Sequence, residues 1–242
     1  GVKIKLTCLK SSRSPALPSL DPAHALPAQF KRDNNLSRTR GAVYELAACN
    51  PWQYFATLTL DAARRDRFDL SAFRRDFAQW LRNYNRLHAA AVKYLLIPEQ
   101  HKDGAWHMHG LLSGLSDSQL IRNRFGYLDW PGYAKRFGFI SLSEIRSQER
   151  VSSYITKYIT KDMSARLREL GAHLYYASKG LKRAEPMGVY RLKGRAEPEW
   201  DFESDWVKVK WVTPEEFDEA AHMMYAKRGE LSDLGLTTGE AE

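Results

Sequence analysis

The sequence contains little cysteine and no long hydrophobic run. Its two cysteines, Cys8 and Cys49, form no CxxC pair, which argues against a disulfide scaffold or a thiolate zinc site and fits a reducing cytosol. No apolar run reaches the length of a membrane span, and none is flanked like a signal peptide. We therefore expect a cytoplasmic protein with no membrane partner. No GxxxxGK(S/T) loop occurs, so we also expect no helicase domain in this chain.

Acidic residues are fewer than basic ones. The 242 residues include 37 Lys and Arg against 29 Asp and Glu, which gives a formal net charge of +8 at pH 7. A basic excess favours polyanions such as nucleic acid, because each phosphate neutralised by Lys or Arg releases counterions. Charge alone does not identify the partner, so the prediction of nucleic acid depends on finding a site.

Composition divides the chain into three parts. Residues 1–40 hold four prolines and several serines, which predicts an extended or poorly ordered arm. The basic residues near the end of the arm are candidates for DNA contact: Lys31, Arg32, Arg38 and Arg40. Residues 41–200 carry the patterns of a folded domain. Residues 201–242 predict a strand, a helix opened by a capping box at Thr213, and a tail.

Hydrophobic periodicity predicts the fold of the central part. The expected order is strand, amphipathic helix, strand hairpin, short helix, strand and helix, at residues 52–60, 69–92, 93–99 with 105–112, 116–125, 138–145 and 148–170. Hairpin strands pair antiparallel, and these helices do not alternate strictly with strands. We therefore expect an α+β fold with one antiparallel sheet and helices packed on it.

The sequence His107-Met108-His109 predicts a metal site. On a strand, the two imidazoles point the same way, about 6–7 Å apart, while Met108 points into the core. Glu99 on the preceding strand is the expected third ligand, because a carboxylate suits Mg²⁺ or Mn²⁺. A two-residue turn would instead place Gln100 opposite His107. Gln100 and His101 therefore remain alternatives. The alternative to a metal site is a pair of structural histidines.

Two tyrosines and two lysines recur every four residues in a predicted helix. Tyr154 and Tyr158 share one face of it, and Lys157 and Lys161 share an adjacent one. A phenol ionises near pH 10, roughly, so it needs nearby positive charge to become a nucleophile at neutral pH. The four residues are therefore candidates for catalysis, in which a tyrosine attacks a phosphate. The alternative is an amphipathic helix with polar tyrosines at its border.

Three segments, in this order, resemble the HUH endonucleases, specifically the rolling-circle replication initiators of small single-stranded DNA phages and plasmids. Residues 55–60 (FATLTL) resemble the first motif, residues 106–110 (WHMHG) the HUH motif, and residues 154–162 the tyrosine motif. The combination of the last two is specific, whereas the first is weak alone. The tyrosines follow the HUH motif, which disfavours a relaxase.

The resemblance implies a ferredoxin-like fold with a five-stranded antiparallel sheet. It implies that His107, His109 and Glu99 bind a divalent ion, Mg²⁺ or Mn²⁺, and that Tyr154 and Tyr158 are nucleophiles. A tyrosine would nick single-stranded or hairpin origin DNA, leave a 5′-phosphotyrosine and a free 3′-hydroxyl, and later rejoin the strand. In a related plasmid branch, a Glu stands at the position of Tyr154, so we expect Tyr158 to cut first. The opposite assignment remains open.

The resemblance also implies a bacterial host cell, whose helicase and polymerase would be partners. Two other functions remain open at this stage. One is a two-tyrosine HUH transposase, and the other is a non-catalytic DNA-binding regulator.

Aromatic and basic residues mingle in two segments after the HUH motif, and arginines follow the first predicted strand. Stacking combined with phosphate pairing is how proteins hold single strands. The candidate DNA contacts are Arg64, Arg65, Trp130, Lys135, Arg136, Lys179, Lys182 and Arg183. The alternative is a set of core aromatics beside a solvated basic rim.

Overall fold

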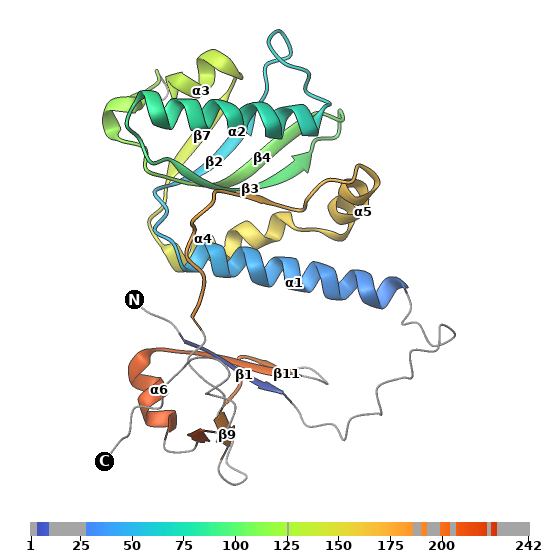
Figure 1. Cartoon of the computed structure of the whole chain (residues 1–242), viewed down its shortest axis with the longest axis vertical. Helices are drawn as coiled ribbons and strands as arrows, with labels where there is room; N and C mark the ends of the chain where they lie inside the picture. Colours follow the sequence, from blue (N-terminus) through green and yellow to red (C-terminus); the bar gives the residue numbers. More distant parts are fainter. Residues whose placement is uncertain are drawn as a thin grey trace. The chain divides into compact units, whose positions relative to one another are not determined.

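The computed structural model describes residues 4–9, 28–124, 126–185, 190–192, 199–203, 207–221 and 224–226. The chain forms two compact units, one of Leu26–Ala184 and one of Gly1–Ala25 with Glu185–Glu242. In the described residues, no helix is both long and apolar enough to cross a membrane. The larger unit contains all the predicted catalytic and metal-binding residues (Figure 1).

A seven-stranded antiparallel sheet forms the centre of the larger unit, in the order β5-β6-β7-β2-β4-β3-β8. Its strands are β2 (Tyr54–Thr59), β3 (Lys93–Gln100), β4 (Trp106–Ser113), β5 (Ile121–Arg122), β6 (Leu128–Asp129), β7 (Ile140–Glu144) and β8 (Tyr176–Ala177). The predicted α+β class is confirmed. The sheet has seven strands rather than five because β5, β6 and β8 add two residues each, too few for a periodic pattern to reveal.

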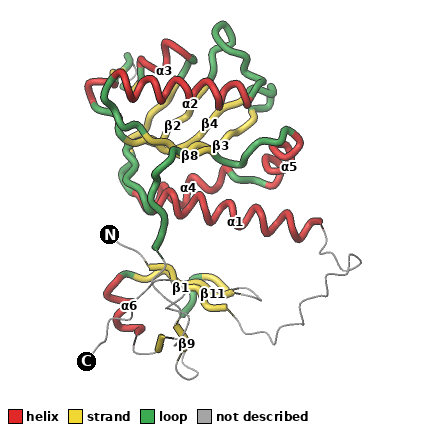
Figure 2. The backbone as a smooth tube through the Cα atoms, viewed as in Figure 1, coloured by secondary structure: helices red, strands yellow, loops and turns green. Residues whose placement is uncertain are grey.

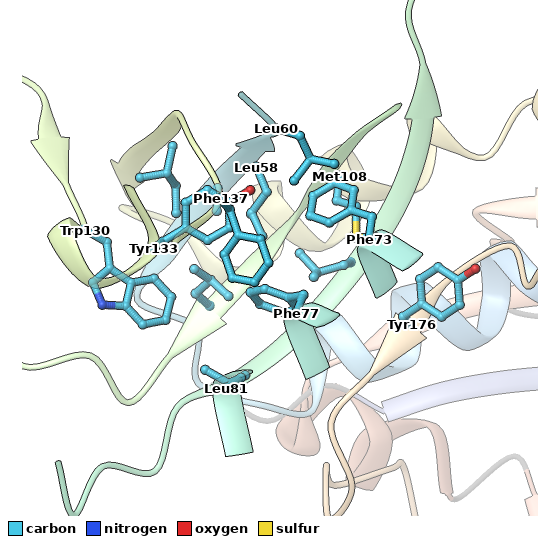
Figure 3. Close-up of a cluster of buried hydrophobic side chains, with 14 of the residues drawn as sticks. Leu58, Leu60, Phe73, Phe77, Leu81, Met108, Trp130, Tyr133, Phe137 and Tyr176 are labelled. Atoms are coloured by element: carbon cyan, nitrogen blue, oxygen red, sulfur yellow. The ribbon is translucent and has the colours of Figure 1, made fainter. Parts of the chain in front are cut away.

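One face of the sheet is covered by α2 (Leu70–Leu87) and α3 (Pro131–Arg136) (Figure 2). Asp69 caps α2, since its side chain accepts a hydrogen bond from the backbone N–H of Ala72. The apolar stripe of α2 packs on the sheet residues Leu58 and Met108 and on aromatic side chains around α3 (Figure 3). This is the larger of the two hydrophobic cores.

The other face of the sheet is covered by α1 (Ala28–Ala48) and α4 (Gln148–Ile155) (Figure 1). Val43 and Leu46 of α1 pack in one cluster with Ile155 and with Leu111 of the sheet. We predicted an arm over residues 1–40, whereas a helix begins at Ala28. Its buried positions begin only at Leu36, so the first turns show no helical apolar stripe that a sequence pattern could detect.

The tyrosine segment is a broken helix rather than the continuous one predicted for residues 148–170. After α4, residues Thr156–Tyr158 form a 3₁₀ turn, η3, and a separate helix, α5, covers Lys161–Glu169. The break lies at Ile159 and Thr160, both with extended backbone at ψ 87° and 165°. The Thr160 hydroxyl accepts a hydrogen bond from the backbone N–H of Met163. A threonine that caps a new helix competes with continuation of the old one.

The smaller unit pairs strands from the two ends of the chain. β1 (Ile4–Leu9) and β10 (Phe202–Glu203) flank β11 (Val207–Val212), and β9 (Tyr190–Leu192) pairs with β12 (Met224–Ala226). The predicted capping box opens α6 (Pro214–Ala221): Glu216 accepts from the N–H of Thr213 and donates its own N–H to the Thr213 hydroxyl. The pairing of β1 with β11 lies outside what a local pattern can predict.

Candidate active site

The histidine pair lies on β4, on the face of the sheet that α1 and α4 cover. Met108, between the two histidines, is 1% exposed in the core under α2. Because side chains alternate along a strand, His107 and His109 point to the other face. The predicted alternation is confirmed, and both imidazoles are half-buried.

Two threonines of β2 hold the imidazoles from the neighbouring strand. Thr57 is paired with His109 and Thr59 with His107. The threonine hydroxyls lie 3.1 Å and 3.0 Å from the respective Nδ1 atoms. A partner at Nδ1 fixes the ring orientation and leaves Nε2 as the outward-facing nitrogen. The sequence reasoning assigned no role to these threonines, although alternation along residues 55–60 places both on the histidine face.

Glu99 lies opposite His107 in the β3–β4 pairing, and Gln100 lies opposite Trp106. The predicted register is therefore confirmed, and Gln100 belongs to the other side of the sheet, where Trp106 is buried. The Glu99 Oε2 atom is 2.6 Å from His109 Nε2. Gln100 instead donates to the carbonyl of Gly104 at 2.7 Å. His101 lies nearer the turn, with its ring centroid 5.5 Å from that of His107.

The donor set fits a divalent cation in its chemistry. Within the described residues, no three or more His, Cys, Asp or Glu side chains are already arranged around a common metal position. The two imidazoles and the adjacent carboxylate are nevertheless ligand types that serve Mg²⁺ or Mn²⁺. Binding would require Glu99 to exchange its contact with His109 for one with the ion.

Both imidazoles favour the neutral form that metal ligation requires. Burial, followed by the neighbouring His101, lowers the pKa of His107. Burial also lowers the pKa of His109, and this effect exceeds the opposing influence of the Glu99 carboxylate.

The tyrosine segment brings both phenols to the histidines. The Tyr158 ring stacks on His109, with the centroids 4.3 Å apart and the planes 13° apart. The Tyr154 and Tyr158 hydroxyl oxygens are 3.4 Å apart. Phe55 of β2 lies edge-on to the Tyr154 ring at 5.3 Å. The predicted imidazoles and phenols therefore share one site, and their chemical roles stay predictions.

The two phenols differ in how readily they ionise. A hydrogen bond with Lys157, followed by one with Tyr158, lowers the pKa of Tyr154. The Lys157 Nζ atom lies 3.4 Å from the Tyr154 ring centroid. Burial, followed by the hydrogen bond with Tyr154, raises the pKa of Tyr158. Tyr154 is thus the more acidic and more exposed phenol, whereas Tyr158 is the one in contact with an imidazole.

The two predicted lysines are separated by the helix break. Lys157 lies in η3 between the tyrosines, whereas Lys161 is the first residue of α5. The regular four-residue spacing on one helix face, on which the pairing of these lysines was based, does not exist in the fold.

Several predicted DNA contacts have structural partners instead. Trp130 is fully buried and its Nε1 donates to the Tyr84 hydroxyl at 3.0 Å, so the prediction that it stacks on DNA is wrong. Arg64 donates to the Lys135 carbonyl at 3.0 Å and pairs with Asp61 at 3.3 Å. Arg65 pairs with Asp76 at 3.4 Å.

The remaining candidates lie at the surface. Arg183 pairs with Glu45 at 3.1 Å. The side chains of Lys135, Arg136, Lys179 and Lys182 are exposed. Contact of these residues with DNA stays a prediction.

An exposed aromatic ring that the sequence reasoning missed lies on the histidine face. Ile140 of β7 is buried opposite Leu58, so the preceding residue, Phe139, points to the other side of the sheet. The Phe139 carbonyl accepts the N–H of Thr59 at 2.9 Å, and its side chain is 70% exposed. Beside Tyr154, an open groove of about 700 Å³ is lined by Ser147, Glu149, Arg150 and Ser153.

Comparison with known proteins gives one match. Residues 53–163 match a family model of replication-associated proteins, the ORF2 family. The matched segment runs from just before β2 to the first turn of α5, so it includes Glu99, both histidines and both tyrosines. The match is consistent with a Rep-type replication initiator that interacts with DNA. No curated protein and no solved structure matches the chain significantly.

Proposed function

We propose that this chain is a replication initiator that nicks single-stranded origin DNA by tyrosine attack and later rejoins the strand. The observation that carries the proposal is the stacking of Tyr158 on His109, 4.3 Å between ring centroids, with the Tyr154 hydroxyl 3.4 Å from that of Tyr158. Two phenols held against an imidazole pair, beside a lysine, are what phosphoryl transfer to tyrosine requires. The family match to replication-associated proteins supports the same reading.

In this proposal, Glu99, His107 and His109 hold one divalent cation, Mg²⁺ or Mn²⁺. The cation would supply positive charge that stabilises charge developing on the phosphate. Thr57 and Thr59 keep the imidazoles oriented through Nδ1, so that both Nε2 atoms face the same region.

The chemistry of the tyrosines follows from their difference in acidity. Lys157 lowers the pKa of Tyr154, so a Tyr154 phenolate can accept the proton of Tyr158 across their hydroxyl contact. The Tyr158 oxygen then attacks phosphorus, a P–O bond to tyrosine forms, and the bond from phosphorus to the 3′ oxygen breaks. The 3′ oxygen takes up a proton and leaves as a free hydroxyl, while the 5′ phosphate stays on Tyr158. Attack on this link by a 3′-hydroxyl reverses the reaction and rejoins a strand.

The uncovered half of the histidine face provides a path for the strand. Phe139 offers an exposed ring two strands away from His107 in the sheet order, and base stacking on aromatic rings tolerates any sequence. Arg150 lines the groove beside Tyr154, where it can pair with a phosphate.

A covalent adduct assay tests the proposal. The full chain is incubated with a set of single-stranded oligonucleotides and Mn²⁺, and protein–DNA adducts are separated on a denaturing gel. We expect an adduct with the unaltered chain, none after addition of EDTA, and none with the double variant Tyr154→Phe/Tyr158→Phe. Tyr94→Phe is the matched control, because Tyr94 packs against Phe77 on the opposite face of the sheet. An adduct that persists in the double variant would refute the nucleophile assignment. DNA binding without any adduct would favour a non-catalytic regulator.

A further inference from the structure

The break that follows Tyr158 is held by a residue far away in the sequence. Arg40 of α1 donates from Nε and from Nη2 to the carbonyl oxygen of Ile159, at 2.9 Å and 2.6 Å. Arg40 lies outside residues 53–163, the segment that matches the family model. The arginine was a candidate for DNA contact in the sequence, but its guanidinium is engaged with protein backbone.

Ile159 is the residue at which the tyrosine segment leaves helical geometry. Carbonyls at the end of a helix have no partner within the helix and need one from elsewhere. The two N–H groups of Arg40 supply that partner, and both contacts are part-buried. A guanidinium presents its donors in a rigid plane, so two bonds to one oxygen fix its direction as well as its distance.

The backbone on either side of Tyr158 is thereby fixed. On the near side, the N–H of Ile159 closes η3 by donating to the Thr156 carbonyl at 3.0 Å. The Ile159 side chain is fully buried in the cluster that includes Ile155. Arg40 adds the third constraint, at the peptide group that immediately follows Ile159.

We propose that Arg40 is a positioning residue for the tyrosine segment, whose guanidinium holds the Ile159 carbonyl and thereby keeps the Tyr158 ring on His109. The proposal rests on the proposed function for its catalytic consequence, but its structural part stands on the contacts above. Loss of the clamp lets residues 158–160 shift relative to the sheet. A misplacement of about 1 Å can cost on the order of a hundredfold in rate.

The test compares Arg40→Gln, Arg40→Lys and the matched control Arg86→Gln. Arg86 is an exposed arginine in the last turn of α2, on the opposite face of the sheet, so its variant loses the same charge. We expect Arg40→Gln to lower kcat for adduct formation by about tenfold to a hundredfold, with KM for DNA changed by less than about twofold. Arg40→Lys, which keeps the charge without the planar fork, should fall between Arg40→Gln and the unaltered chain. The control should match the unaltered chain.

A second measurement reports on position without requiring activity. The full chain is labelled with 3-fluorotyrosine, and the ¹⁹F NMR signal of Tyr158 is assigned from its absence in Tyr158→Phe. Because the ring stacks on His109, Arg40→Gln should shift this signal, whereas Arg86→Gln should not. A shifted signal in a chain that forms no adduct would support the clamp while the proposed function fails. An unmoved signal would overturn the proposal, as would a raised KM at unchanged kcat, which would make Arg40 a DNA contact.

Discussion

Gly110 separates β3 from β4 at the histidine site, and its replacement by alanine is expected to damage both stability and site geometry. A Cβ at this position would lie 2.2 Å from the Leu95 carbonyl oxygen, 2.5 Å from Leu96 Cδ2 and 2.9 Å from Leu96 Cα. Real Cβ atoms essentially never lie closer than 3.0 Å to another heavy atom, so the carbonyl must retreat by about 0.8 Å, the difference between 3.0 and 2.2 Å. The nearest atom is backbone, so no side-chain rotation can relieve the clash.

The displacement has two measurable consequences. Ladder hydrogen bonds of about 2.9 Å would stretch past the limit of a true hydrogen bond. Overpacking typically costs about 1–3 kcal/mol, and we expect Gly110→Ala to lie near 3 kcal/mol. The shift of β3 would also separate Glu99 from His109, now 2.6 Å apart.

Urea unfolding followed by tryptophan fluorescence measures the loss, and titration with Mn²⁺ measures the effect on the site. Gly41→Ala is the matched control, because nothing lies within 4 Å of a Cβ at this helical position. It should raise the free energy of unfolding by about 0.5–1 kcal/mol. A Gly110→Ala chain as stable as the unaltered one would refute the close pairing of Leu96 with Gly110 on which the Glu99 register depends.

Three further predictions concern the site and its substrate. Thr57→Val and Thr59→Val remove the hydroxyls at Nδ1 without changing side-chain volume, and each should weaken Mn²⁺ affinity by about tenfold to a hundredfold in calorimetry; unchanged affinity in both would contradict the orienting role. In a Tyr158→Phe background, Lys157→Gln removes the group that lowers the pKa of Tyr154, so the pH at which adduct formation rises should move upward, and a profile that moves downward or stays in place would count against it. Phe139→Ala should weaken binding of single-stranded oligonucleotides by about 1–3 kcal/mol in fluorescence anisotropy, whereas Leu87→Ala, on a side chain 74% exposed at the end of α2, should not; equal effects would argue against a stacking role.

The histidine strand could be predicted from the sequence because its information is local. An alternation of period two fixes which side of a strand each residue faces, and the burial of Met108 between two half-buried histidines follows directly. The register of Glu99 was predicted from ligand chemistry rather than from the turn, and the pairing of Glu99 with His107 agrees with it.

Other features depend on partners that a local pattern does not contain. Thr160 was compatible with a helix interior, and only its hydrogen bond to Met163 shows that it begins a new helix. Trp130 looks the same in sequence whether its ring stacks on DNA or donates to Tyr84 in the core. Arg40 carries no sign of its carbonyl partner, which lies 119 residues away along the chain.

Mass-spectrometric mapping of the covalent adduct tests most directly whether the phenols act at the imidazole site. Trypsin cuts after Arg150, Lys157 and Lys161, so it places Tyr154 in residues 151–157 and Tyr158 in residues 158–161. After Mn²⁺-dependent reaction with an oligonucleotide and nuclease trimming, we expect the nucleotide 5′-phosphate mass first on residues 158–161, and no mass on either peptide in His107→Ala/His109→Ala. Nucleotide mass on any other peptide, or unchanged labelling in the histidine variant, would contradict the account.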